Sequence, residues 1–99
     1  MRKTTQQAAN AFMASKPFKM SNTKVVVHDY ATDGTITQLY LHDNIIAERS
    51  ETTLRITNAG WPSNTTKERL NGLPGVCISQ KKGKWYLNGK EWNGEWTTI

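Results

Sequence analysis

Cysteine, histidine and long apolar runs are all scarce in this sequence. Its 99 residues hold a single cysteine, Cys77, and two histidines. One cysteine excludes an internal disulfide, and so few thiols and imidazoles, at no recognisable ligand spacing, argue against a metal site. No apolar run approaches the roughly 20 residues of a bilayer span, and the N-terminus lacks the apolar stretch of a secretory signal. The sequence therefore predicts a cytosolic chain with no membrane span, metal or cofactor, and with Cys77 as a small residue in a strand.

Catalytic groups are equally scarce. No glycine-rich phosphate loop is present, and the eight carboxylates are scattered along the chain. The pairs His28-Asp29 and His42-Asp43 are neighbours in sequence, but adjacent residues of a strand point to opposite faces. Neither pair forms an oriented histidine–carboxylate couple by strand geometry alone. We expect a protein that is not an enzyme.

Length and charge point to one small, basic domain covering residues 1–99. The hydrophobic fraction of 36% is low for a chain that builds its core alone, which leaves a homodimer or another partner open. The net charge is +5. Residues 1–24 carry five cations and no acids, residues 25–79 carry two more acids than cations, and residues 80–99 carry four lysines against two glutamates. The basic ends could form a cationic face for phosphates or an acidic protein, or merely a solvated surface.

The first half of the sequence predicts a helix followed by four strands. Thr4 and Gln7 match a capping box, and Phe12 and Met13 fall on one helical face with two alanines, which favours a helix over residues 5–15. Valine-rich and alternating segments then predict strands at residues 24–30, 35–41, 45–49 and 53–57. The first two strands are joined by an Asp33-Gly34 turn. These strands should form an antiparallel meander.

The second half predicts one short helix and a hairpin. Thr65 and Glu68 match a capping box for a helix over residues 65–71, and Trp61 before it is expected to pack against the sheet. Strands at residues 76–80 and 84–87 follow, and very short strands end the chain. The predicted fold is α+β, in the order α-β-β-β-β-α-β-β, with both helices packed on the sheet.

The start of the central helix is one candidate binding site. Polar side chains and two cations gather near unpaired backbone N–H groups there, which suits a phosphate or carboxylate. The candidate residues are Asn64, Thr65, Thr66, Lys67 and Arg69. Helix capping alone explains the same residue types, so both interpretations stay open.

The C-terminal hairpin is the second candidate site. Its lysines alternate with aromatic residues, a combination that binds single-stranded nucleic acid through backbone charge and base stacking. The candidate residues are Lys81, Lys82, Lys84, Tyr86, Lys90, Trp92 and Trp96. Strand alternation places Trp85 and Tyr86 on opposite faces, so at most one of them is available for stacking.

Three segments together resemble a small domain of unknown function that recurs in tailed-bacteriophage genomes. They are Asn22-Thr23-Lys24-Val25, Leu41-His42-Asp43-Asn44-Ile45-Ile46-Ala47, and the block from Gly60-Trp61 to Leu70-Asn71. The resemblance covers residues 11–87. It implies an accessory phage protein in the cytoplasm of an infected bacterium, and it supplies no catalytic residues.

Two functions fit these observations. The first is a non-catalytic basic protein that binds nucleic acid through the lysine-rich C-terminal hairpin. The alternative is a protein-binding effector that inhibits a host enzyme or defence complex, with Trp92 or Trp96 as exposed anchors.

Overall fold

The computed structural model describes residues 3–30 and 34–99 of an α+β protein. Its elements, in chain order, are α1 (Lys3–Met13), β1 (Phe18–Met20), β2 (Thr23–Tyr30), β3 (Gly34–Leu41), β4 (Asn44–Arg49), β5 (Leu54–Ile56), α2 (Asn64–Leu70), β6 (Ile78–Lys81), β7 (Lys84–Leu87), β8 (Lys90–Glu91) and β9 (Thr97–Thr98). The predicted class is confirmed. Asp33, half of the predicted turn between β2 and β3, lies outside the described residues.

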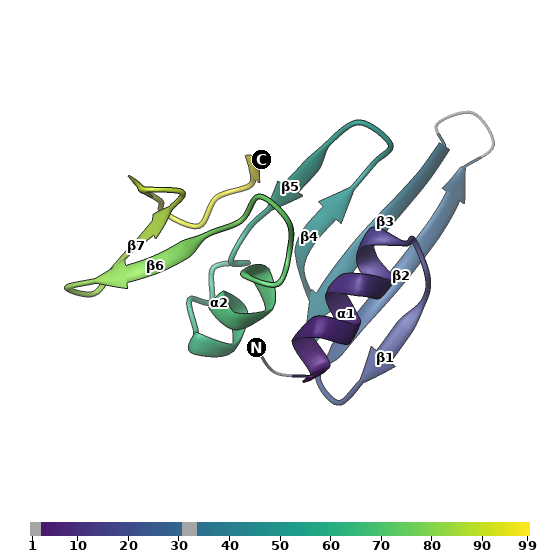
Figure 1. Cartoon of the computed structure of the whole chain (residues 1–99), viewed down its shortest axis with the longest axis horizontal. Coiled ribbons are helices and arrows are strands. Elements are labelled where there is room, and N and C mark those ends of the chain that lie inside the picture. The colour runs from purple at the N-terminus through teal and green to yellow at the C-terminus, as the bar shows by residue number, and fades with distance from the viewer. Residues whose placement is uncertain (1–2, 31–33) are drawn as a thin grey trace.

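The strands form two antiparallel sheets (Figure 1). The larger has the order β1-β2-β3-β4-β5-β9, and the smaller has the order β6-β7-β8. The predicted meander of four strands forms the centre of the larger sheet, β2 to β5. The predicted order omitted β1, because Phe18–Met20 is only three residues long and is defined by its pairing with β2 rather than by a local pattern. It also did not foresee that β9 returns to pair with β5.

Helix α1 covers one face of the larger sheet. Ala8, Ala9 and Phe12 are buried, whereas Met13 is exposed, contrary to the prediction for that residue. The helix begins at Lys3, before the predicted start, so Thr4 lies inside it and does not cap it. The predicted capping box is wrong, since Gln7 Oε1 is buried without a hydrogen-bond partner in the described part of the chain.

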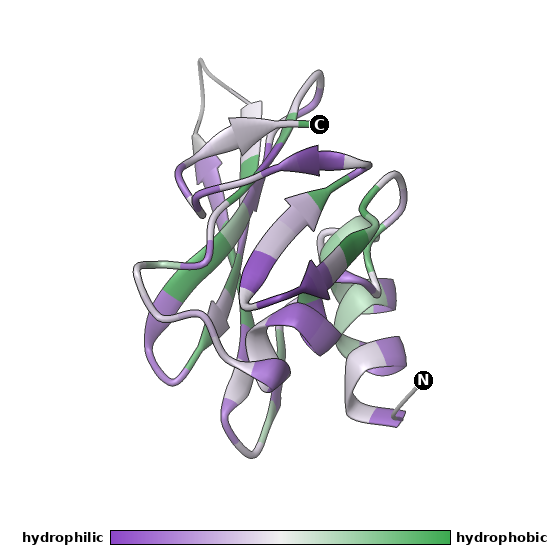
Figure 2. Cartoon of the chain, turned by 90° about the vertical axis from the view of Figure 1, so that its left-hand side faces the viewer, coloured by the Kyte–Doolittle hydropathy of each residue, from purple (hydrophilic) through white to green (hydrophobic). Residues whose placement is uncertain are grey.

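Helix α2 is capped by Ser63 and not by Thr65. The Ser63 side chain accepts a hydrogen bond from the Thr66 backbone N–H at 3.1 Å, in the geometry of an N-cap. Ser63 is extended, with φ −128° and ψ 161°, so the helix starts one residue earlier than predicted. Leu70 is fully buried, as predicted. Figure 2 shows both helices on the same side of the larger sheet.

The C-terminal segment joins the two sheets. Trp85 and Trp92 are buried with ring centroids 6.2 Å apart, and both belong to the same hydrophobic cluster as Phe12 and Leu70. Beyond Trp92, the Gly94 carbonyl accepts from the Thr57 hydroxyl at 2.6 Å and from the Asn58 N–H at 3.0 Å. These bonds bring the chain back to the loop after β5.

Cys77 is not in a strand. It precedes β6 and is exposed, and its backbone N–H donates to Asn88 Oδ1 at 2.9 Å. The prediction of a strand residue is therefore wrong: Cys77 lies outside β6, and it is held by this bond and by the Asn88 N–H, which donates to the Cys77 carbonyl at 2.8 Å. None of the described helices is long and apolar enough to cross a membrane.

Candidate nucleic-acid interface

The basic hairpin formed by β6 and β7 is the most exposed cationic feature among the predicted sites. Figure 1 shows it reaching away from the larger sheet. Lys81 and Lys84 are register partners on either side of the Lys82-Gly83 turn, and all three lysines are exposed. Lys82 and Gly83 both have positive φ, 53° and 78°, which is the geometry of a two-residue hairpin turn. The turn thus presents three ammonium groups at one tip.

One aromatic residue of the hairpin shares a face with the lysines. Tyr86 is partnered by Ser79 and Glu91, so strand alternation puts it on the same face as Lys81 and Lys84. Tyr86 is half-buried, and its neighbour Trp85 is buried on the other face. The structure therefore confirms that only one of these two rings can be free to stack. Lys84 also forms an exposed ion pair with Glu91 at 3.4 Å.

The two other tryptophans of the predicted site differ in burial. Trp92 is only 9% exposed, and its indole N–H donates to Thr97 Oγ1 at 2.9 Å. The prediction of an exposed anchor is wrong for Trp92, because its neighbours in the C-terminal strands fold over it. Trp96 is 44% exposed, and the Arg55 guanidinium lies 4.9 Å from its ring centroid. Lys90 is exposed in β8.

The predicted anion site at the start of α2 is not assembled. Arg69 is 6% exposed and donates to Thr5 Oγ1 at 2.6 Å and to Thr23 Oγ1 at 2.9 Å, so it points into the core. Thr66 is buried as well, and Lys67 Nζ donates to Gln80 Oε1 at 3.2 Å. Asn64 is exposed and Thr65 is half-buried. Helical periodicity explains the error, because Arg69 and Leu70 share the inward side of this seven-residue helix.

Trp61 is exposed rather than packed between helix and sheet. Its exposed fraction is 55%, and its ring stacks on His42 with centroids 5.5 Å apart at an interplanar angle of 28°. The backbone on both sides is fixed, since the Trp61 N–H donates to the Asn58 carbonyl and Thr66 Oγ1 donates to the Trp61 carbonyl. Sequence reasoning expected neither the exposed ring nor its partner. His42 itself lies in the turn between β3 and β4.

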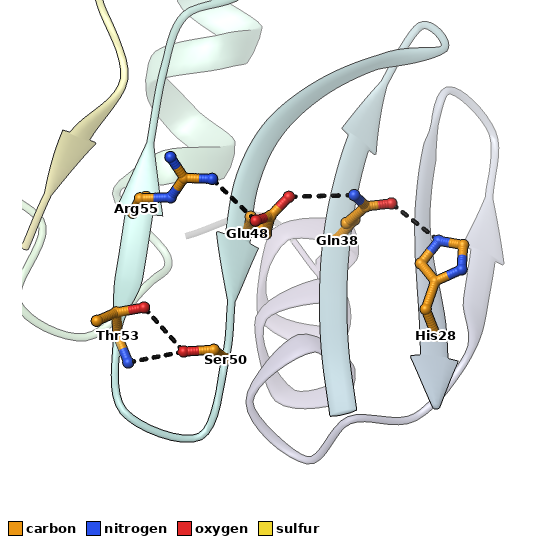
Figure 3. Close-up of polar contacts among 6 residues, drawn as sticks. All are labelled: His28, Gln38, Glu48, Ser50, Thr53 and Arg55. Carbon is orange, nitrogen blue, oxygen red and sulfur yellow. Dashed lines mark hydrogen bonds and ion pairs between the residues drawn. The ribbon is translucent and has the colours of Figure 1, made fainter. Parts of the chain in front are cut away.

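A polar ladder crosses the face of the larger sheet that lies opposite α1 (Figure 3). His28 Nε2 lies 3.0 Å from Gln38 Oε1, and Gln38 Nε2 donates to Glu48 Oε2 at 3.1 Å. Arg55 continues the row by donating to Glu48 Oε1 at 2.9 Å. Each residue comes from a different strand, β2 to β5. Gln38 and Glu48, and Glu48 and Arg55, are register partners, whereas His28 reaches Gln38 diagonally because its own partner is Ile36. Each of these side chains thus contacts the next one in the row, and the row links strands β2 to β5.

The fold changes the pKa of the Glu48 carboxyl. Burial by itself raises its pKa, but the hydrogen bonds from Gln38 and Arg55 and the positive charge of Arg55 outweigh burial and lower the pKa below its ordinary value. The carboxylate is therefore held ionised within the ladder. In the described part of the chain, no three His, Cys, Asp or Glu side chains are grouped to hold a metal ion.

Comparison with known proteins identifies a family without adding an activity. No curated protein matches the chain, and no solved structure matches it either. The model of the Kyanoviridae Gp96 protein family matches residues 1–98, nearly the whole sequence. The resemblance to a tailed-phage domain is thereby confirmed, and the chain belongs to the Kyanoviridae Gp96 protein family.

Proposed function

We propose that this protein is a non-catalytic nucleic-acid-binding accessory protein that works in the cytoplasm of the phage-infected host bacterium. The observation that carries the proposal is the tip of the β6–β7 hairpin. Lys81, Lys82 and Lys84 are all exposed there, and Tyr86 shares a face with two of them. Ammonium groups beside an aromatic ring suit a phosphate backbone with bases that stack without sequence preference.

The shape of the hairpin supports this function. Trp85 and Leu87 bury the other face of the smaller sheet, so the lysine face is anchored to a packed core and does not have to order itself on binding. Glu91 is the one acid that pairs with these lysines among the described residues, at 3.4 Å from Lys84. Because both partners are exposed, this ion pair is weak and can give way to a phosphate.

The test is binding of unrelated single-stranded oligonucleotides at two salt concentrations. The double variant Lys81→Gln and Lys82→Gln should weaken binding to every sequence and reduce the slope of log K against log salt by about 1.4, at about 0.7 for each lost phosphate contact. Glu91→Gln should strengthen binding, because it releases Lys84. The matched control is Lys3→Gln and Lys16→Gln, which removes the same charge from exposed lysines elsewhere.

Two outcomes would contradict the proposal. The first is an unmodified protein that fails to bind at low salt. The second is a control variant that loses as much affinity as the hairpin variant, because this would assign binding to net charge and not to the hairpin.

A protein-binding effector that inhibits a host enzyme or defence complex is the second candidate. It is favoured by Trp96, a large ring left 44% exposed beside Arg55 at the end of the polar ladder. Tryptophan and arginine are the residue types that most often dominate protein interfaces. A stoichiometric complex recovered from host lysate with the unmodified protein, and lost with Trp96→Ala but kept with Lys81→Gln and Lys82→Gln, would select this candidate.

A further inference from the structure

Two hairpin turns lie side by side at one end of the larger sheet. The β1–β2 turn contains Ser21 and Asn22, and the β3–β4 turn contains His42 and Asp43. The His42 backbone N–H donates to the Asn22 carbonyl at 2.9 Å, and Asn22 Nδ2 lies 3.2 Å from His42 Nε2. The two turns are thus fixed to each other by backbone and side-chain contacts.

A polar pocket of about 270 Å³ opens between these turns. The residues that line it include two lysines, Lys19 and Lys24, together with the polar residues Ser21 and Asn22. One carboxylate, Asp43, also lines the pocket, and its distance of 3.7 Å from Lys24 Nζ marks an ion pair. Two cations against one largely solvent-exposed carboxylate favour an anion. The volume is at the lower end for small-molecule sites, so the anion should be small.

Trp61 adds a stacking surface next to the pocket. His42, which lines the pocket, is also the ring on which Trp61 stacks. Trp61 is exposed, although hydrogen bonds to its backbone N–H and its carbonyl hold its main chain in place. A rigidly held, exposed aromatic ring is a preorganised surface for a nucleobase.

We propose that the pocket between the two turns binds the phosphate of a nucleotide unit and that Trp61 stacks on its base. Lys19 and Lys24 face the phosphate, Ser21 and Asn22 donate hydrogen bonds to it, and Asp43 weakens its binding. The proposal deepens the proposed function and rests on it for the class of ligand, but it uses a different surface. The nucleotide is either free or part of a single strand.

The experiment is an NMR titration of the full chain with adenosine 5′-monophosphate. The backbone amides of Ser21, Asn22 and His42 and the indole N–H of Trp61 should shift together and saturate. Trp61→Ala should weaken nucleotide binding about tenfold, the value of one base stack, while leaving the weaker affinity for inorganic phosphate unchanged. Lys19→Gln should weaken both ligands.

Two further variants fix the sign of the charge effect. Asp43→Asn should strengthen binding of the nucleotide and of phosphate. This variant tests the pocket independently of whether Trp61→Ala folds. Lys16→Gln, which removes the same charge from an exposed lysine that does not line the pocket, should change neither. Absence of saturable shifts at these amides, or equal nucleotide affinity of Trp61→Ala and the unmodified protein, would overturn the proposal.

A second set of ligands distinguishes a free nucleotide from a nucleotide within a strand. It also distinguishes binding at the pocket from binding at the hairpin. A tetranucleotide without a terminal phosphate that shifts the same amides identifies a unit within a strand, whereas binding of the mononucleotide alone identifies a free nucleotide. The variant Lys81→Gln and Lys82→Gln should leave the mononucleotide shifts intact. If strands bind through the hairpin but the pocket amides never shift, the pocket proposal fails and the proposed function stands. If the mononucleotide shifts the pocket amides but no strand binds, the pocket proposal stands and the proposed binding of strands by the hairpin fails.

Discussion

Arg69 shows how a single buried cation connects three elements. Its guanidinium donates to Thr5 in α1 and to Thr23 in β2, and all three side chains are buried. Arginine suits this position because its planar group offers several donors in a fixed geometry. Gly72 completes the arrangement, since a Cβ atom there would lie 2.6 Å from Thr5 Cγ2. The charge that the sequence assigns to an anion site thus serves the packing of α2 on the rest of the fold.

Two tryptophans of equal size should respond very differently to truncation. Trp92→Ala should lower the free energy of unfolding by about 3 to 5 kcal/mol, because a buried ring and its indole hydrogen bonds are lost. Trp61→Ala should lower it by less than about 1 kcal/mol, because most of that ring already contacts water. Urea denaturation of both variants checks this pair. A large loss at Trp61 would mean that its stacking on His42 supports the fold.

At the scale of the strands, Glu48 should make stability depend on acid pH. Its pKa in the folded protein lies below the ordinary value of a glutamate, because the Gln38 and Arg55 contacts outweigh burial. The carboxylate therefore contributes stability above that ordinary value, and the contribution is lost as the pH falls through the lower pKa of the folded state. Glu48→Gln should lose less stability than the unmodified protein between neutral pH and about pH 3.

Urea midpoints at the two pH values test this expectation. The control is Glu95→Gln, which removes an exposed carboxylate without touching the ladder. If the two variants and the unmodified protein lose the same stability on acidification, the ladder does not hold Glu48 ionised.

Periodicity predicted the long elements well, and tertiary pairing decided the rest. The strand around Val25 is rich in β-branched residues and the strand around Leu39 alternates in burial, and the bounds of both differ from the prediction by one residue. In contrast, β1 and β9 are too short to carry a pattern and exist through their partners β2 and β5. Hydroxyl-rich runs such as Ser63 to Thr66 offer several possible caps, and only the extended backbone at Ser63 selects one.

The exposed lysines of the hairpin were predictable from the sequence, whereas the pocket between the two turns was not. Lysines around a Lys-Gly turn in a hairpin are exposed by local geometry alone. Trp92 is instead held by the last strand, where Thr97 accepts from its indole N–H, and Trp61 stacks on His42 of the β3–β4 turn. Local sequence context gave the opposite expectation for both residues.

On the scale of the whole molecule, each basic end of the sequence supplies one proposed contact. Lys19 and Lys24, from the cationic N-terminal region, line the pocket between the turns, and Lys81 and Lys82 form the hairpin tip. The acidic middle of the chain provides Glu48, which is neutralised by Arg55 inside the ladder.

The return of the C-terminus to the larger sheet gives the last prediction, for deletion of residues 96–99. Strand β9 pairs with Arg55 and Ile56, the Ile99 N–H donates to the Leu54 carbonyl at 2.8 Å, and Thr97 accepts from the Trp92 indole. Deletion should lower the free energy of unfolding by about 3 kcal/mol, at about 1 kcal/mol for each lost hydrogen bond. It also turns β5 into an open edge, which favours association between copies.

Urea denaturation and sedimentation at several protein concentrations measure both effects. Trp96→Ala is the matched control, because it removes an exposed ring from the deleted segment and keeps the strand. The deletion should be less stable than this control and should associate as concentration rises, since the unpaired groups of β5 can pair with those of another copy. A deletion variant that matches the control in both measurements would show that β9 neither stabilises the larger sheet nor protects its edge.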